Sequence, residues 1–314
     1  MTRYISTRGE APTLGFCDVM LSFPAILLAL LLLAAPGLRP RGGLLERALI
    51  MIKRRDCLGA ALLGPWAVGP LWAAPDRTGG DPLGSMQWPS LHEQYLDKAP
   101  VRFTDAVLVR TPAFADDALN VPLQIDARAL ADVGGGIARM LVLADRNPVR
   151  EVLEFEPLRA LPMLAFRMRL EQASPIRALV QTRDGQWHAG GAMVQAAGGG
   201  CTVPGATRAD GSWRTTLNQV RARIFNNVIE GSRRLRVNIM HPMDTGLVAG
   251  IPAFYIERLA LLDAQGEPWW RLQLHEPVSE NPLLSFELPA QGPQAFHLSG
   301  QDNNGNRIAA EVRA

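Results

Sequence analysis

Phe166-Arg167-Met168-Arg169-Leu170 places an apolar side chain at every second position, with an arginine between each pair. Side chains alternate between the two faces of a β-strand, so this spacing predicts a strand with one buried and one solvated face. Val121-Pro122-Leu123-Gln124-Ile125 alternates in the same way, and so does Arg234-Leu235-Arg236-Val237-Asn238-Ile239 in the second half of the chain. The repetition indicates that both halves of the protein are built from strands.

Other short apolar runs extend the pattern along the chain. In the first half we expect strands at 139–144, 152–155 and 176–182 and near 193–194, and in the second half at 256–262, 270–274, 284–288, 296–298 and 308–312. Five to seven short strands per half, spaced by 8–12 residues, are typical of β-sandwiches. The sequence therefore predicts an all-β protein with two immunoglobulin-like β-sandwich domains, residues 76–197 and 220–314, joined by a flexible glycine-rich segment, residues 198–219.

The start of the first domain is predicted to be irregular. Residues 76–89 are rich in proline and glycine, and we expect them to be disordered. Ser90-Leu91-His92-Glu93 has the spacing of a capping box and predicts one short helix that runs to Leu96.

Composition excludes a nucleic-acid-binding function. The chain has 314 residues, a formal net charge of +2 and 47% hydrophobic residues. A basic surface for nucleic acid would require a larger and more concentrated positive charge. The 24 prolines and 29 glycines favour turns and short strands over long helices.

Residues 1–75 are expected to be an upstream extension followed by an export signal. Lys53-Arg54-Arg55 precedes an apolar run from Leu58 to Trp72, and Ala73-Ala74-Pro75 follows it. Export signals have this order of charged, apolar and small residues. We expect translation to start at Met51, export by a twin-arginine or Sec route, and cleavage after Ala73, which leaves no stable membrane insertion. A second apolar run at 23–38 either lies upstream of the true start or forms a membrane-associated extension.

Cysteine usage singles out one side chain. The chain contains Cys17, Cys57 and Cys201, and removal of the leader would leave Cys201 alone. An unpaired cysteine in an exported protein is either an intermolecular partner or a free reactive thiol.

The residues around Cys201 favour a flexible arm. Gly198, Gly199 and Gly200 precede the thiol and Gly205 follows it, so this backbone carries few side chains and has wide conformational freedom. The arm would present the thiol to another protein's active site. The simpler alternative is a glycine-rich surface loop that happens to contain a cysteine.

Catalytic and metal sites are not predicted. The five histidines have no metal-ligand spacing, and about forty residues separate Cys201 from His241, too many for the compact Cys-His-Met loop of a blue-copper site. A Cys-His hydrolase requires a rigid nucleophile, which three glycines do not provide. We therefore expect neither an enzyme nor a metal protein.

Several longer motifs resemble the two subunits of the Sox sulfur carrier, SoxY and SoxZ, fused in one chain. The SoxY-like segments are Asp145-Arg146-Asn147-Pro148, Phe166-Arg167-Met168-Arg169-Leu170, Thr182-Arg183-Asp184-Gly185 and Gly199-Gly200-Cys201. The SoxZ-like segments are His241-Pro242-Met243-Asp244-Thr245-Gly246, Pro252-Ala253-Phe254-Tyr255-Ile256-Glu257 and Val278-Ser279-Glu280-Asn281-Pro282. The fusion is similar to the quinoprotein dehydrogenase-associated SoxYZ-like carriers.

The resemblance implies a periplasmic protein that carries intermediates of thiosulfate oxidation as a covalent adduct on Cys201, without another cofactor. It implies as partners the Sox-type periplasmic enzymes, including c-type cytochromes and a sulfate-releasing hydrolase, and a quinoprotein dehydrogenase system. One departure concerns the arm, because Thr202-Val203-Pro204 and a whole domain follow Cys201 where a SoxY chain ends soon after the thiol. The alternative function is a periplasmic adaptor that docks onto a quinoprotein dehydrogenase system and does not use its thiol.

The segment His241 to Gly246 is expected to form a loop at the interface between the two halves. Its alternative role is a docking surface for partner enzymes.

Overall fold

The computed structural model describes residues 76–211, 213–226 and 231–313. The predicted export signal and upstream extension lie outside the described residues. The compact unit that contains the described residues spans Ala73–Ala314.

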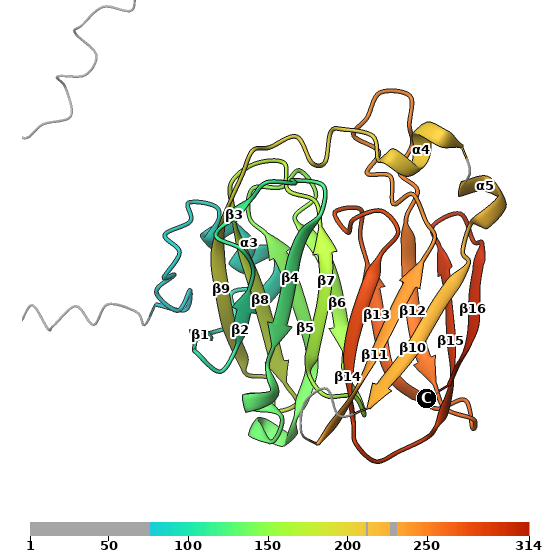
Figure 1. The fold of residues 1–314 in the computed structure, drawn as a ribbon. Coiled ribbons are helices and arrows are strands. Elements are labelled where there is room, and N and C mark those ends of the chain that lie inside the picture. Colours follow the sequence, from blue (N-terminus) through green and yellow to red (C-terminus); the bar gives the residue numbers. More distant parts are fainter. Residues whose placement is uncertain (1–75, 212, 227–230, 314) are drawn as a thin grey trace, which may run out of the picture. The chain divides into compact units, whose positions relative to one another are not determined.

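Two β-sheets make up most of this unit (Figure 1). The strands of the first half are β1 (Val101–Phe103), β2 (Leu108–Arg110), β3 (Phe114–Ala115), β4 (Val121–Asp126), β5 (Ile137–Ala144), β6 (Glu151–Glu156), β7 (Met163–Met168), β8 (Ser174–Thr182) and β9 (Trp187–Ala196). Those of the second half are β10 (Val220–Asn226), β11 (Ser232–Ile239), β12 (Ile256–Leu262), β13 (Pro268–Leu274), β14 (Leu283–Pro289), β15 (Ala295–Asp302) and β16 (Arg307–Arg313). The helices are α3 (Trp88–Leu96), α4 (Ala206–Asp210) and α5 (Trp213–Thr216), with short 3-10 turns at η2 (Arg128–Leu130) and η3 (Val133–Gly135).

Both sheets run through both halves of the chain. The ten-stranded sheet has the order β1-β9-β8-β5-β6-β13-β12-β15-β16, with β3 beside β9, and the six-stranded sheet has the order β10-β11-β14-β7-β4-β2. The halves join where β6 pairs with β13 and where β7 pairs with β14, each pair antiparallel. The all-β sandwich prediction is confirmed. The junction is made of main-chain hydrogen bonds, which satisfy strand edges that would otherwise be exposed.

An aromatic cluster fills the core beneath this junction. Phe155 comes from the first half, and Trp270 and Phe286 come from the second. The Trp270 and Phe286 rings stack with centroids 4.1 Å apart, and the Phe155 centroid lies 5.6 Å from that of Phe286. All three side chains are fully buried. Burial of aromatic side chains contributes heavily to core stability, so the two halves stabilise each other.

The strand predictions at 121–125, 166–170 and 256–262 correspond to β4, β7 and β12. Alternation identified β4 and β7 because one face of each strand is buried and the other is not, whereas β12 was expected from a short apolar run. The sequence did not reveal β10, where arginines alternate with the modestly apolar Val220 and Ala222.

The start of the first domain differs from its prediction. The helix begins at Trp88, so Ser90 lies inside it and not at its start, and the N-cap residue Gln87 makes no side-chain capping hydrogen bond. The preceding turns contain Asp81, whose carboxylate accepts hydrogen bonds from the buried Arg177 at 2.6 and 2.8 Å. Arg177 also binds the buried Asp145. Because a buried guanidinium requires partners, this ion pair orders a segment whose composition indicates disorder.

Candidate functional site

Cys201 lies between the end of β9 and the start of α4, in the segment that Figure 1 shows crossing the ends of the strands toward α4 and α5. Its side chain is only 2% exposed. The Sγ atom lies 3.9 Å from the carbonyl oxygen of Arg169, close to the geometry of a weak S–H hydrogen bond. It is the free cysteine of the described part of the chain.

The glycines before Cys201 are docked against the first half of the chain. The amide of Gly199 donates to the carbonyl oxygen of Glu171 at 2.9 Å, and that of Gly200 donates to Leu170 at 3.0 Å. A Cβ at Gly200 would lie 2.2 Å from the carbonyl oxygen of Ala118 and 2.6 Å from that of Leu170. The structure therefore differs from the prediction of a freely exposed arm. Glycine is required at position 200 because two backbone segments approach it closely.

Gly198 and Gly205 have separate local roles. Gly198 has φ of +98°, a conformation that side chains with a Cβ rarely adopt. A Cβ at Gly205 would lie 2.2 Å from Oε2 of Glu280. These glycines allow the chain to turn into and out of the docked position.

The Glu171 carboxylate accepts hydrogen bonds from the backbone at Cys201. Its Oε2 atom accepts hydrogen bonds from the amides of Cys201 at 3.0 Å and Thr202 at 3.2 Å. The Thr202 hydroxyl donates to Oε1 of the same carboxylate at 3.0 Å. Asn147 orients the segment that follows β7. Its Oδ1 accepts a hydrogen bond from the Glu171 amide, and its Nδ2 donates one to the Arg169 carbonyl. Glu171 thus holds the cysteine-bearing turn by accepting hydrogen bonds from three donors.

The second half of the chain also contacts the cysteine. The Thr245 hydroxyl donates to the carbonyl oxygen of Cys201 at 2.6 Å. Thr245 belongs to the segment His241–Gly246, of which residues 241 to 245 are buried. This burial favours the interface role over the docking-surface role for that segment.

Arg169 occupies the space between the cysteine segment and the second half. Its side chain is 2% exposed, and its terminal nitrogens lie 3.4 Å from the carbonyl oxygens of Gly200 and Val203 and 3.5 Å from that of Pro242. Its Nε has no hydrogen-bond partner among the described residues. Burial lowers the pKa of this guanidinium, while nearby carboxylates oppose that shift. Arg169 therefore links both sides of the site with long hydrogen bonds to carbonyl groups.

Downstream of the cysteine, Glu280 fixes the chain again. Its carboxylate accepts hydrogen bonds from the amides of Ala206 at 3.2 Å and Thr207 at 3.0 Å, at the first turn of α4. Asn281 donates to the Thr207 hydroxyl at 2.9 Å. The cysteine segment is therefore a loop that is held at both ends.

His241 is buried behind the site. Its Nδ1 accepts a hydrogen bond from the Met243 amide, and its Nε2 lies 3.7 Å from the buried Asp302. Burial lowers the pKa of His241 to about 4, although the carboxylate of Asp302 acts in the opposite direction. The imidazole is therefore neutral at pH 7 and supports the loop as a packed, uncharged group.

The electrostatics of the docked thiol oppose its reaction. Burial raises the pKa of Cys201 to about 12, the negative charge of Glu171 adds to that shift, and Arg169 opposes it. With such a pKa only about one thiol in 10⁵ is ionised at pH 7, and the thiolate is the nucleophilic form. In this position the cysteine is therefore protected from reaction.

Sequence reasoning identified Cys201 and the four glycines but not Glu171, Arg169 or Glu280 as parts of the site. These residues lie in strand-end motifs, and only the fold shows that their side chains converge on the cysteine loop. Within the described ranges, no cluster of potential metal ligands is present. None of the described helices is long and apolar enough to span a bilayer.

Comparison with known proteins gives a match for each half. Residues 92–201 match the family model for the sulfur oxidation protein SoxY, and residues 226–313 match that for the sulphur oxidation protein SoxZ. The SoxY match ends at Cys201. Among solved structures, the sulfur carrier protein SoxY from Chlorobium limicola f. thiosulfatophilum is similar at 18% identity and a TM-score of 0.31, over 35% of this chain and 96% of that chain. No curated protein matches the chain.

Proposed function

We propose that this chain, which joins a SoxY domain to a SoxZ domain, carries sulfur-oxidation intermediates on the thiol of Cys201 in the periplasm. SoxY and SoxZ are carrier and adaptor proteins without catalytic activity, so the chain is a substrate of enzymes and not an enzyme. One observation carries the proposal: the SoxY match ends at Cys201, which both halves hold through Glu171 and Thr245.

The geometry supports a carrier with two states. In the docked state described above, the thiol is buried and protonated. In the open state, the loop extends and a partner enzyme receives the thiol in its own active site. The partner then supplies the groups that ionise the thiol, which the docked site lacks. Glu171, Thr245 and Arg169 contact mainly the backbone of the loop, so the hydrogen bonds that hold the loop do not involve the sulfur atom.

The first reaction in this scheme loads thiosulfate onto the thiol. A bond forms between Sγ of Cys201 and the terminal sulfur of thiosulfate, and the thiol loses its proton. Two electrons leave in the process, so an oxidant such as a c-type cytochrome must accept them. The carrier retains a Cys–S–S–SO₃⁻ group, from which a hydrolase can release sulfate.

The finer parts of the proposal rest on the sequence. Residues 51–75 have the pattern of an export signal, which supports periplasmic location. The fused arrangement supports an association with a quinoprotein dehydrogenase system.

Intact-mass analysis of protein from its native host tests the carrier function. We expect a mass increase consistent with sulfur or a thiosulfonate, localised to Cys201 and removed by a mild reductant, because such adducts exchange with thiols. A Cys201→Ser protein should retain an unfolding temperature close to that of wild type, since Sγ makes one weak hydrogen bond that a hydroxyl can replace, and should carry no adduct.

The buried thiol is the observation that favours a second function, that of an adaptor that does not use its cysteine. If the wild-type protein never carries an adduct during thiosulfate oxidation and Cys201→Ser leaves the host's growth unchanged, the adaptor function replaces the carrier function.

A further inference from the structure

The outer face of the six-stranded sheet has an excess of arginine. Its six strands contain seven arginines, of which Arg233 is buried and the other six lie on this face, and two carboxylates, Asp126 and Glu287. The carboxylates are already paired: Asp126 binds Arg128 and lies 3.5 Å from Arg110, while Glu287 binds Arg234. Four arginines make no side-chain hydrogen bond or ion pair with other described residues: Arg167, Arg221, Arg223 and Arg236. All four are exposed, so the face carries uncompensated positive charge.

The strand register brings two of these arginines directly opposite each other. Arg223 on β10 pairs with Arg236 on β11 in the antiparallel ladder. Like charges at directly opposed positions destabilise a sheet. Their positive charges remain uncompensated within the described protein, and an anionic partner would compensate them.

The same face is hollowed between its arginines. One register row runs from Arg236 through Ser285, Ala165 and Gln124 to Arg110. The short side chains at its centre leave a cavity of about 370 Å³, and a second cavity of about 190 Å³ adjoins Arg223 and Arg236. The row crosses five strands, and four spacings of about 4.8 Å give it a length of about 19 Å. This concave row has the dimensions of a protein-binding surface.

The basic face ends at the cysteine loop. Arg167 lies on β7 only two residues before Arg169, which contacts the loop. The Arg167 carbonyl accepts a hydrogen bond from the amide of Ser279, the neighbour of Glu280. A partner bound across this face would therefore lie beside the loop that carries Cys201.

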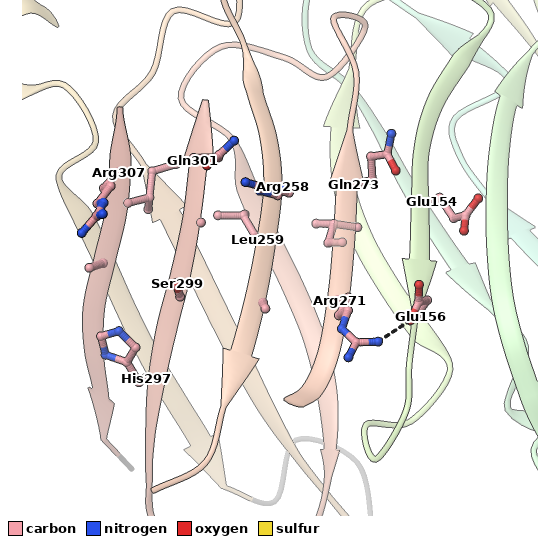
Figure 2. A pocket seen from close by; sticks show the side chains of 15 residues that line it. Glu154, Glu156, Arg258, Leu259, Arg271, Gln273, His297, Ser299, Gln301 and Arg307 are labelled. Atoms are coloured by element: carbon pink, nitrogen blue, oxygen red, sulfur yellow. Dashed lines mark hydrogen bonds and ion pairs between the residues drawn. The ribbon is translucent and has the colours of Figure 1, made fainter. Parts of the chain in front are cut away.

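The outer face of the ten-stranded sheet differs in its charge. It has a larger cavity, of about 590 Å³, but there Arg271 pairs with Glu156 at 3.1 Å, as Figure 2 shows, and His297 lies 3.1 Å from Glu311. Glu154 faces the same cavity as Arg258 (Figure 2). Its charges are mixed, so it lacks the uncompensated charge that would select an anionic partner.

We propose that the outer face of the six-stranded sheet is the docking surface for an acidic surface of the partner enzyme that receives Cys201. The inference rests on the proposed function, because it names the binding chemistry of the partner at the same site. A protein fits this surface better than an anionic membrane, since the face is hollow and, on its described strands, Leu108 is the exposed large apolar side chain. Complementary charge would steer the encounter and orient the partner toward the loop.

Site-specific crosslinking tests the surface in the full-length protein. A photoreactive p-benzoylphenylalanine replaces Ser285 at the centre of the basic row, and Ser299 on the other sheet serves as the matched position. In host cells that oxidise thiosulfate, we expect a protein crosslink at position 285 and none at 299. The crosslinked peptide, identified by mass spectrometry, should carry several Asp or Glu residues.

Binding of the identified partner then measures the contribution of charge. We expect the Arg223→Gln/Arg236→Gln protein to bind the purified partner about tenfold more weakly and with less dependence on salt, because removal of steering charges acts mainly at low ionic strength. The matched Arg258→Gln/Arg307→Gln protein should bind like wild type. Equal affinity of the first variant, a crosslinked peptide without acidic residues, or retention on phosphatidylglycerol vesicles in place of a protein crosslink would each overturn the proposal.

The mass of Cys201 in the same cells separates the two proposals. If the protein forms a charge-dependent crosslink at position 285 but never carries sulfur, the docking surface is supported and the carrier function is rejected. Sulfur on Cys201 without any crosslink at position 285 retains the carrier function and rejects the surface.

Discussion

Replacement of Glu171 by alanine should release the cysteine loop. The substitution removes the acceptor of three hydrogen bonds, from the amides of Cys201 and Thr202 and from the Thr202 hydroxyl. A hydrogen bond to a charged group contributes about 1.5 kcal/mol or more. Because solvent weakens these bonds at a half-buried site, we assign about 3 kcal/mol to the three hydrogen bonds together. Since 1.4 kcal/mol corresponds to a factor of ten, the open fraction of the loop should rise about 100-fold.

Alkylation of Cys201 by iodoacetamide at pH 7.5, followed by intact-mass analysis, measures this fraction. When the loop opens and closes faster than it reacts, the alkylation rate is proportional to the open population. The control is Glu156→Ala, which removes a carboxylate from the outer face of the ten-stranded sheet. An unchanged alkylation rate in a folded Glu171→Ala protein, or a wild-type rate equal to that of the unfolded chain, would refute the docked-loop mechanism.

The remaining predictions concern the same loop and its support. Thr245→Val removes one hydrogen bond to Cys201, worth about 1 kcal/mol, and should accelerate alkylation about fivefold. Gly200→Ala places a Cβ against the carbonyl of Ala118, so the loop should stay open and alkylation should approach the rate of the unfolded chain while the β-sheets remain folded. His241 has a folded-state pKa of about 4, below its ordinary value of 6.5, so it stabilises the fold above pH 6.5 and loses that contribution as the pH falls toward 4. Urea unfolding between pH 7 and pH 4 should show this loss, and a His241→Asn protein should show less of it.

The sequence predicts strands well where apolar and polar residues alternate, as in β4 and β7, because residue chemistry follows the face on which each side chain lies. It could not reveal that β6 pairs with β13 across the two halves, since pairing of distant strands depends on edges and registers that no local pattern records. At the site, the structure differs from the freely exposed glycine arm that the sequence predicts. Glycine serves both flexible segments and close backbone approach, and Gly200 serves close approach in the docked state.

The loop that bears Cys201 has a fixed length between two anchors, and this length sets a distance rule for any partner. Ala196 ends β9 and Ala206 begins α4, so the thiol-bearing residue stands five Cα steps from each anchor. Five extended steps span at most about 17 Å. If both anchors hold, an enzyme that modifies the thiol must place its reactive centre within that radius and admit two chain segments side by side. Its active site should therefore be an open cleft, from which the loaded loop can leave sideways for the next enzyme without being threaded.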